Sequence, residues 1–361
     1  MSMTSTTKKT SCTICNMFEI TKNRSILIKG IVIIMMVFLH LFNGNNTEQC
    51  TNLLYIGNEP FAKWLSHACN PVPFYVLLCG YGLAYTYKNS DLGFTKQLRR
   101  IAKLYVHYWI ILAVFLIIGW NLHPERYVLT WTRILVNMIG WETNYNHEMW
   151  FLFPYSMIAL TSRYIIQTVE KIGYLKAVVI TAIINFCACY VISLYHSTVL
   201  ADNHWLNWCI VYLQFLYPFT VGVFFCCTSF QCHCQMSTWL VLIIMAFSVI
   251  VVAFIDVSVT SIVYVPLMIF LFCQLPYPKW LERAFMELGR KSMPMWMIHT
   301  WFCYYLFKEE VYSLKYPVLI LGGTLIVSYL TAIPFMWLIG KVFAMVSSTI
   351  HCRRNHCAYG R

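Results

Sequence analysis

The sequence predicts an all-α, polytopic membrane protein with about ten transmembrane helices and with its N- and C-termini in the cytosol. Of its 361 residues, 59% are hydrophobic and only 11% are charged, whereas about a quarter of the residues in a typical soluble domain are charged. Apolar runs of roughly 20 residues, long enough to cross a bilayer, recur along the chain. The formal net charge of +12 comes without a basic stripe carrying interleaved aromatic residues, which disfavours nucleic acid as a partner.

Ten apolar segments are predicted to form the membrane helices. They cover residues 25–43, 68–87, 104–120, 149–168, 175–196, 206–227, 238–255, 258–274, 292–308 and 316–340. The connection at 121–147 is long, and its stretch WTRILVNMIGW (131–141) is expected to form a short helix at the outer surface. Asp256 falls between the seventh and eighth segments and is interpreted as a turn residue.

The basic residues indicate the direction of these helices. With the N-terminus in the cytosol, the 26 Lys and Arg residues lie at or near the cytosolic face except Lys63, Arg126, Arg133, Lys308 and Lys315. The cytosolic loops of membrane proteins carry such an excess of Lys and Arg. A missed or added helix would reverse the side of every later loop, so the asymmetry favours ten crossings.

Three regions are predicted along the chain. They are a loose cytosolic tail (1–23), the membrane domain (24–345) and a basic cytosolic tail (346–361). The first apolar run follows basic residues, but no A-x-A cleavage site comes after it. We therefore interpret it as a signal anchor rather than a cleaved signal peptide.

Most of the 16 cysteines lie inside apolar runs, where a cysteine behaves as a small hydrophobic residue. Cys50 and Cys69 flank the first outer loop. The sequence is compatible with a disulfide between them and also with two separate thiols. The stretch CCTSFQCHCQ (226–235) does not have the usual spacing of zinc ligands. We expect a reduced cytosolic loop there and no metal.

The first apolar run, KGIVIIMMVFLH, carries ionisable residues at both ends, Lys29 and His40. In an α-helix they share one face and lie about 16 Å apart along the axis. Ionisable groups inside a membrane are costly, so each is a candidate functional residue. The alternative is structural: Lys29 reaches lipid phosphates, and His40 bonds to a backbone carbonyl.

Four more segments have recognisable patterns. They are PFYVLLCGYGLAYTY (73–87), FTKQLRRIAKLYVHYW (94–109), HEMWFLFPY (147–155) and LGRKSMPMWMIHTWF (288–302). Together with the basic residue and histidine of the first run, these segments resemble the acyltransferase 3 family of integral membrane O-acyltransferases over nearly the whole chain. Lys29, Cys79 and Trp296 stand where that family usually has Arg, Ser and Tyr.

The resemblance implies ten core membrane helices and an activity. Members of the family move an acyl group, usually acetyl from acetyl-CoA, to a hydroxyl of a carbohydrate such as O-antigen or exopolysaccharide. Acyl-CoA would be a co-substrate rather than a permanently bound cofactor. The expected setting is a multi-pass protein of a bacterial inner or plasma membrane, acting on a cell-envelope glycan alone or with a separate extracytoplasmic partner.

His40 and Glu148 are the predicted catalytic residues. An imidazole suits removal of a proton from a sugar hydroxyl as that hydroxyl attacks a thioester. Glu148 begins the fourth segment on the outer side, towards which His40 also points, so it could orient His40 or hold the acceptor. A carboxylate at the interface that only faces water is the alternative for Glu148.

Four residues are predicted to bind acyl-CoA: Lys29, Arg100, Lys103 and His299. The three cations would hold the phosphates of CoA, and His299 would line the acyl-CoA channel. Basic residues beside a membrane also bind anionic lipid headgroups, and a histidine in a span can simply pack, so these alternatives stay open. No metal ligands are predicted.

The main rival function is a transporter or flippase of a lipid-linked or small sugar, which would use the same cations and histidine without bond chemistry. Asp and Glu are nearly absent from the middle of the apolar runs, which disfavours a proton-coupled transporter. A non-catalytic sensor or assembly subunit is a third possibility.

Overall fold

Helices make up nearly all of the chain in the computed structural model, which describes residues 19–228 and 236–358. The exception is a short antiparallel hairpin of β1 (Tyr55–Ile56) and β2 (Glu59–Pro60). The all-α class predicted from the sequence is therefore confirmed apart from this hairpin.

Every predicted membrane segment overlaps a helix. These helices are α1 (Lys22–Phe42), α3 (Pro71–Asn89), α4 (Phe94–Leu122), α6 (Leu152–Ile172), α7 (Tyr174–Tyr195), α9 (His204–Cys227), α10 (Thr238–Ile255), α11 (Ser261–Gln274), α13 (Ser292–Thr300) with the π-helix η4 (Trp301–Leu306), and α15 (Pro317–Ala358). Shorter elements connect them: α2 (Phe61–Ser66), α5 (Trp131–Met138), α8 (Val199–Asp202), α12 (Lys279–Arg290), α14 (Lys308–Tyr312) and the 3₁₀ turns η1 (Asn45–Gln49), η2 (His147–Phe151) and η3 (Ser258–Thr260).

Six of these helices are long and apolar enough to cross a membrane: α1, α4, α7, α9, α10 and α15 as far as Met345. The segment Ser258–Gln274 is a shorter apolar helix. The α13 helix has only nine residues, and α6 carries the charged residues Arg163, Glu170 and Lys171. Nearly all of α13 is buried among other helices, where neighbouring protein groups rather than lipid surround its polar atoms.

Several local predictions can be compared with the described residues. The short helix predicted within 131–141 is confirmed as α5. The predicted boundary at residue 345 falls inside α15, which continues as a helix to Ala358. Residues 1–18 of the predicted N-terminal tail lie outside the described residues, as do residues 229–235 of the cysteine-rich stretch. Cys69 has a free thiol, so in this structure it forms no disulfide with Cys50.

Helices α3 and α9 cross so closely that only glycine fits at the contact. A Cβ atom on Gly80 of α3 would lie 2.2 Å from the backbone oxygen of Phe219. A Cβ atom on Gly222 of α9 would lie 2.1 Å from the backbone oxygen of Leu77. Small residues allow membrane helices this close approach, so the pair sets the distance between α3 and α9.

A second glycine pair joins α1 to α12. A Cβ atom on Gly30 would lie 1.9 Å from the backbone oxygen of Phe285, and one on Gly289 would lie 1.9 Å from that of Ile26. Because Gly30 follows Lys29 directly, this contact fixes the part of α1 that carries the predicted cation.

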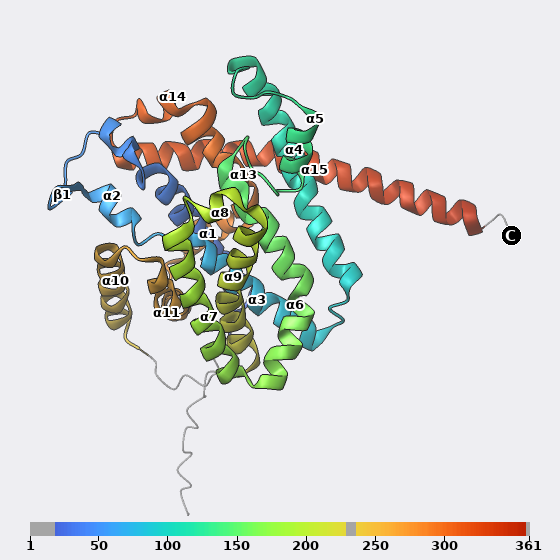
Figure 1. The fold of residues 1–361 in the computed structure, drawn as a ribbon, viewed down its shortest axis with the longest axis horizontal. Coiled ribbons are helices and arrows are strands. Elements are labelled where there is room, and N and C mark those ends of the chain that lie inside the picture. The colour runs from blue at the N-terminus through green and yellow to red at the C-terminus, as the bar shows by residue number, and fades with distance from the viewer. Residues whose placement is uncertain (1–18, 229–235, 359–361) are drawn as a thin grey trace, which may run out of the picture.

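The helices that carry the candidate site lie in the middle of the molecule. Figure 1 shows α10, α2 and α11 on one side of the bundle and α4 with α5 on the other, with α1, α3, α9 and α13 between them. The long α15 runs across the bundle, and its C-terminal part extends beyond the other helices (Figure 1). Residues contributed by these central helices therefore converge from distant parts of the sequence.

Candidate active site

His40 pairs with a second histidine. His40 lies in the last turn of α1 and is half-buried, and His299 lies on α13 and is fully buried. The distance from His40 Nδ1 to His299 Nε2 is 2.8 Å. The shared face of Lys29 and His40 indicated the first histidine, but the second approaches from another helix 259 positions away.

The hydrogen bonds of His299 assign the protons of the pair. Its Nδ1 lies 3.1 Å from the carbonyl oxygen of Met295 and 2.9 Å from that of Trp296, so this nitrogen must donate. The Nε2 of a neutral His299 is then an acceptor, and His40 Nδ1 donates to it. His40 is left with its lone pair on Nε2, which is the form a general base needs.

Glu148 lies in η2 and is half-buried. The hydroxyl of Tyr305 donates to Glu148 Oε2 over 2.5 Å. Within the described part of the chain, the side chain of His40 hydrogen-bonds to His299 and not to Glu148. In this structure it is therefore His299, and not Glu148, that contacts the ring nitrogen of His40.

His40 and Glu148 line the same cavity, of about 240 Å³, which we call the His40 cavity. It lies where α1, α3, α9, α11 and α13 meet. Its other lining residues include Met36, Leu39, Asn70, Trp150, Phe151, Gln214, Tyr217, Ser258, Ser261 and Trp296. A carboxylate and an imidazole therefore face one space that is large enough for a small polar molecule.

The three predicted cations line a different cavity, of about 390 Å³, which we call the Arg100 cavity. Lys29, Arg100 and Lys103 all border it, whereas His299 does not. Gln97 also borders it, and neither polar atom of its buried amide has a hydrogen-bond partner. Such orphaned groups are rare and require an explanation, and a bound ligand would supply the missing partners.

A third cavity, of about 190 Å³, lies between the two and shares lining residues with each. We call it the Cys79 cavity because Cys79 borders both it and the Arg100 cavity, as Lys29 and Tyr155 do. At its other end it shares Phe151 and Trp296 with the His40 cavity. These two rings lie edge to face with centroids 5.5 Å apart, so the Phe151–Trp296 pair forms a constriction between the Cys79 cavity and the His40 cavity.

Lys29 has no ion-pair partner among the described residues, although it is half-buried. Its side chain borders both the Arg100 cavity and the Cys79 cavity. A half-buried cation without a carboxylate nearby is costly unless an anion reaches it. The site thus has three cations at one end, where an anion could bind. At the other end it has an imidazole, about 16 Å further along α1.

Sequence reasoning missed three residues of this arrangement, which are Gln97, Phe151 and Tyr305. Phe151 matters because it packs against Trp296 between the Cys79 and His40 cavities. None has a signal in the sequence, because their importance depends on which helix packs against them. No group of three or more His, Cys, Asp or Glu side chains within residues 19–228 and 236–358 could hold a metal ion.

The comparisons with known proteins agree with the earlier resemblance. The acyltransferase 3 family model, described as an acyltransferase domain, matches residues 23–344. Searches of curated proteins and of solved structures found no match. The chain therefore belongs to the acyltransferase 3 family, and it is a multi-pass membrane acyltransferase.

Proposed function

We propose that this acyltransferase 3 family member transfers an acetyl group from acetyl-CoA to a hydroxyl of a cell-surface or exported carbohydrate, with His40 as the general base. One observation supports this most strongly: His40, with its lone pair on Nε2, borders the first of three cavities in which each shares lining residues with the next, and the last is lined by three cations. Acyl-CoA has phosphates at one end and a thioester at the other, which matches this order of groups.

The donor would enter from the Arg100 cavity. Lys29, Arg100 and Lys103 would hold the phosphates of CoA, and the orphaned amide of Gln97 would gain hydrogen-bond partners. The pantetheine arm would then pass through the Cys79 cavity towards His40. CoA is a co-substrate in this scheme and leaves after each cycle.

The constriction at Phe151 and Trp296 supports a short acyl group. Both side chains are buried and pack against each other. Close-packed interiors do not yield space without a cost in free energy. An acetyl group would fit past the constriction more easily than a longer chain.

The reaction follows from the assigned protons. The acceptor oxygen attacks the carbonyl carbon of the thioester while its proton moves to His40 Nε2. The positive charge on His40 is stabilised by the hydrogen bond that its Nδ1 donates to His299 Nε2, and the carbon–sulfur bond then breaks. His40 returns the proton to the departing CoA sulfur, so the enzyme ends in its starting form. Glu148 would accept a hydrogen bond from the acceptor.

We propose that both termini face the cytosol and that the chain crosses the membrane ten times. The distribution of Lys and Arg supports this, as does the overlap of every predicted segment with a helix. The Arg100 cavity, at the N-terminal half of α4, would then open towards cytosolic acetyl-CoA. A bacterial inner or plasma membrane, with or without a separate extracytoplasmic partner, is the proposed setting.

Transfer of label from radiolabelled acetyl-CoA to membrane and glycan fractions tests this function. We expect label in cells that express the wild-type chain and none above background with His40→Ala at equal protein abundance. Equal labelling by both would contradict the role of His40. If neither labels and the purified wild-type protein does not bind acetyl-CoA, the transporter becomes the better explanation.

A further inference from the structure

A fourth cavity adjoins the His40 cavity and shares no lining residue with the Cys79 and Arg100 cavities. It measures about 220 Å³, and we call it the His67 cavity. It is lined by Leu39, Asn43, Ser66, His67, Cys69, Asn70, Val252, Asp256, Val257, Ser258, Thr260, Ser261 and Tyr264. Most of these side chains are polar, unlike those around the Cys79 cavity.

The His67 cavity continues the His40 cavity. The two share four lining residues, which are Leu39, Asn70, Ser258 and Ser261. Leu39 precedes His40 directly in α1. A molecule in the His67 cavity would therefore adjoin the cavity that His40 lines, and the His67 cavity shares no lining residue with the Cys79 cavity.

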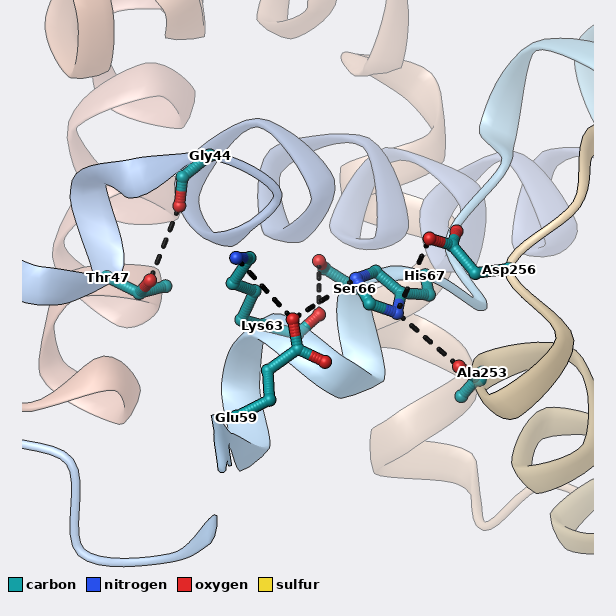
Figure 2. Close-up of polar contacts among 8 residues, drawn as sticks. All are labelled: Gly44, Thr47, Glu59, Lys63, Ser66, His67, Ala253 and Asp256. Atoms are coloured by element: carbon teal, nitrogen blue, oxygen red, sulfur yellow. Dashed lines mark hydrogen bonds and ion pairs between the residues drawn. The ribbon is translucent and has the colours of Figure 1, made fainter. Parts of the chain in front are cut away.

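His67 is held between carboxylates from two elements. Figure 2 shows its ring between Glu59, at the start of the segment that leads into α2, and Asp256, at the end of α10. His67 Nε2 lies 3.6 Å from Glu59 Oε1, and His67 Nδ1 lies 3.8 Å from Asp256 Oδ2. Lys63 pairs with the same oxygen of Glu59 over 3.5 Å. These contacts leave the His67 side chain only 13% exposed.

Asp256 remains available to a ligand. Its carboxylate is 61% exposed, and its contact with His67 is longer than a hydrogen bond. The residue caps α10 in the left-handed conformation, with φ of 46°. The sequence suggested a turn residue there, and Asp256 is one, but its side chain also borders the His67 cavity.

The lining indicates an uncharged, polyhydroxylated ligand. The side chains of Asn70, Ser258 and Ser261 can each donate and accept hydrogen bonds, and the carboxylate of Asp256 can accept two hydroxyls. Asn70 makes no capping hydrogen bond to α3, so its amide is not used in the helix. No Lys or Arg side chain among the described residues borders this cavity, which argues against a phosphate.

We propose that the His67 cavity binds the sugar ring of the acceptor. Asp256, Asn70, Ser258 and Ser261 hold hydroxyls that do not react, and one hydroxyl extends into the His40 cavity towards the imidazole. This assignment rests on the proposed acyl transfer. It adds the place where the acceptor binds, the residues that bind it, and the absence of charge on the bound ring.

Direct binding tests this proposal without requiring turnover. Methyl glucopyranoside, methyl galactopyranoside and methyl mannopyranoside are the probes, with glucose 6-phosphate as the charged comparison. Saturation-transfer NMR measures their binding to the full chain in lipid nanodiscs, and calorimetric titration with acetyl-CoA is carried out in parallel. The variants are Asp256→Asn, whose amide tolerates the left-handed backbone, and Asn70→Leu. The matched control is Asp202→Asn, an exposed aspartate that borders none of the four cavities.

We expect at least one methyl glycoside to bind the wild type and Asp202→Asn equally. Its affinity should fall by about 10-fold or more in Asp256→Asn and in Asn70→Leu, because each loses hydrogen bonds to the ring, while acetyl-CoA binding is unchanged. Equal binding to wild type and variants, no binding of any glycoside, or tighter binding of glucose 6-phosphate would overturn the proposal. If the glycosides behave as expected but acetyl-CoA does not bind, the acyl transfer is wrong and the sugar site remains.

Discussion

At the scale of single residues, the central feature is a chain of hydrogen bonds that ends at His40. It runs from the carbonyls of Met295 and Trp296 through His299 to His40 Nδ1. A base oriented by a second group in this way resembles the arrangement in serine hydrolases, where the third residue fixes the tautomer and the ring. We therefore propose that His299 positions His40; its predicted contact with acyl-CoA stays a prediction.

Removing His299 should slow transfer without affecting donor binding. We expect His299→Ala to lower kcat by about 10²-fold to 10⁴-fold, by analogy with loss of the orienting residue in a catalytic triad, with KM for acetyl-CoA little changed. His299→Asn should recover part of the activity, because its Oδ1 can accept from His40. Steady-state kinetics with the exposed His196→Ala as control checks this. A wild-type kcat for His299→Ala would contradict the orienting role.

Trp296 should limit the length of the acyl chain. We expect Trp296→Ala to raise the ratio of kcat/KM for hexanoyl-CoA over acetyl-CoA by about 10-fold or more, since each methylene accommodated in a pocket changes the ratio substantially. Competition between the two donors measures it. Trp280→Ala, at a Trp that is 71% exposed, is the control. An unchanged ratio would place the acyl group elsewhere.

Some of these residues could be found from the sequence and others could not. Lys29 and His40 are recognisable because the helical repeat puts them on one face, and their spacing within one helix can be read directly from the sequence. Gln97 and His67 are not, because their significance depends on burial and on neighbours from other helices. The sequence showed the position of His299 within its apolar segment, which predicted a place in the acyl-CoA channel. It did not show the contact with His40, because that contact depends on how α1 and α13 pack.

At the scale of elements, glycine contacts hold together the helices around the site. Gly80→Ala should destabilise the protein by about 1–3 kcal/mol, as overpacking does, because its Cβ would lie 2.2 Å from the backbone of α9. Gly82→Ala is a matched control in the same helix, since a Cβ there meets nothing within 4 Å. Thermal unfolding in detergent compares them. Equal Tm values for the two variants would contradict the close crossing of α3 and α9.

The contact between α12 and α15 should depend on pH. Glu287 pairs with Lys291, accepts from the Tyr329 hydroxyl over 2.9 Å and pairs with Arg290 over 3.0 Å. These hydrogen bonds, that from Lys291 foremost, lower the pKa of Glu287 from 4.5 to about 2.

Because the folded form has the lower pKa, this stabilisation is complete above pH 4.5 and is lost as the pH falls towards about 2. We expect wild type to exceed Glu287→Gln in Tm at pH 7 and the difference to shrink over that range. Glu282→Gln is the control on the same helix. A difference that stays constant down to pH 2 would show that the carboxylate is not stabilised in this way.

The positions of helices were more predictable than their interruptions. Hydropathy indicated a segment at 292–308, because it detects apolar length. The chain there divides into α13 and the π-helix η4, followed by the separate α14. Such interruptions depend on local hydrogen bonding and on packing against α1 and α15, neither of which hydropathy reports.

At the scale of the whole molecule, four cavities follow one another from the Arg100 cavity to the His67 cavity. Each shares lining residues with the next. The Arg100 cavity is lined by cations, the Cys79 cavity is mainly apolar, the His40 cavity holds an imidazole and a carboxylate, and the His67 cavity is polar and has no Lys or Arg in its lining. This order would let a charged donor and an uncharged acceptor approach His40 from opposite ends.

The proposed orientation can be tested in cells. An epitope inserted after Asp202, between α8 and α9, should bind antibody added to intact cells or spheroplasts. One inserted at Gly173, between α6 and α7, should bind only after permeabilisation. The reason is that the charge distribution puts these loops on opposite sides. Labelling of both loops from outside would rule out the ten-crossing topology.

The fold class was predictable because composition and apolar length are properties of the whole chain. The number of cavities and their sequence were not, since each is lined by residues from several helices. His40 and Glu148 border one cavity although 108 positions separate them. Only the packing of α1 and η2, which carry them, within the folded bundle brings these two residues together.

The most direct test of the account is a cryo-electron microscopy structure of the full chain with a thioether analogue of acetyl-CoA that cannot transfer its acyl group. We expect the phosphates in contact with Lys29, Arg100 and Lys103 and the acyl end beside His40, beyond Phe151 and Trp296. Phosphates bound elsewhere, or an acyl end that remains in the Arg100 cavity, would contradict the proposed route from donor to base.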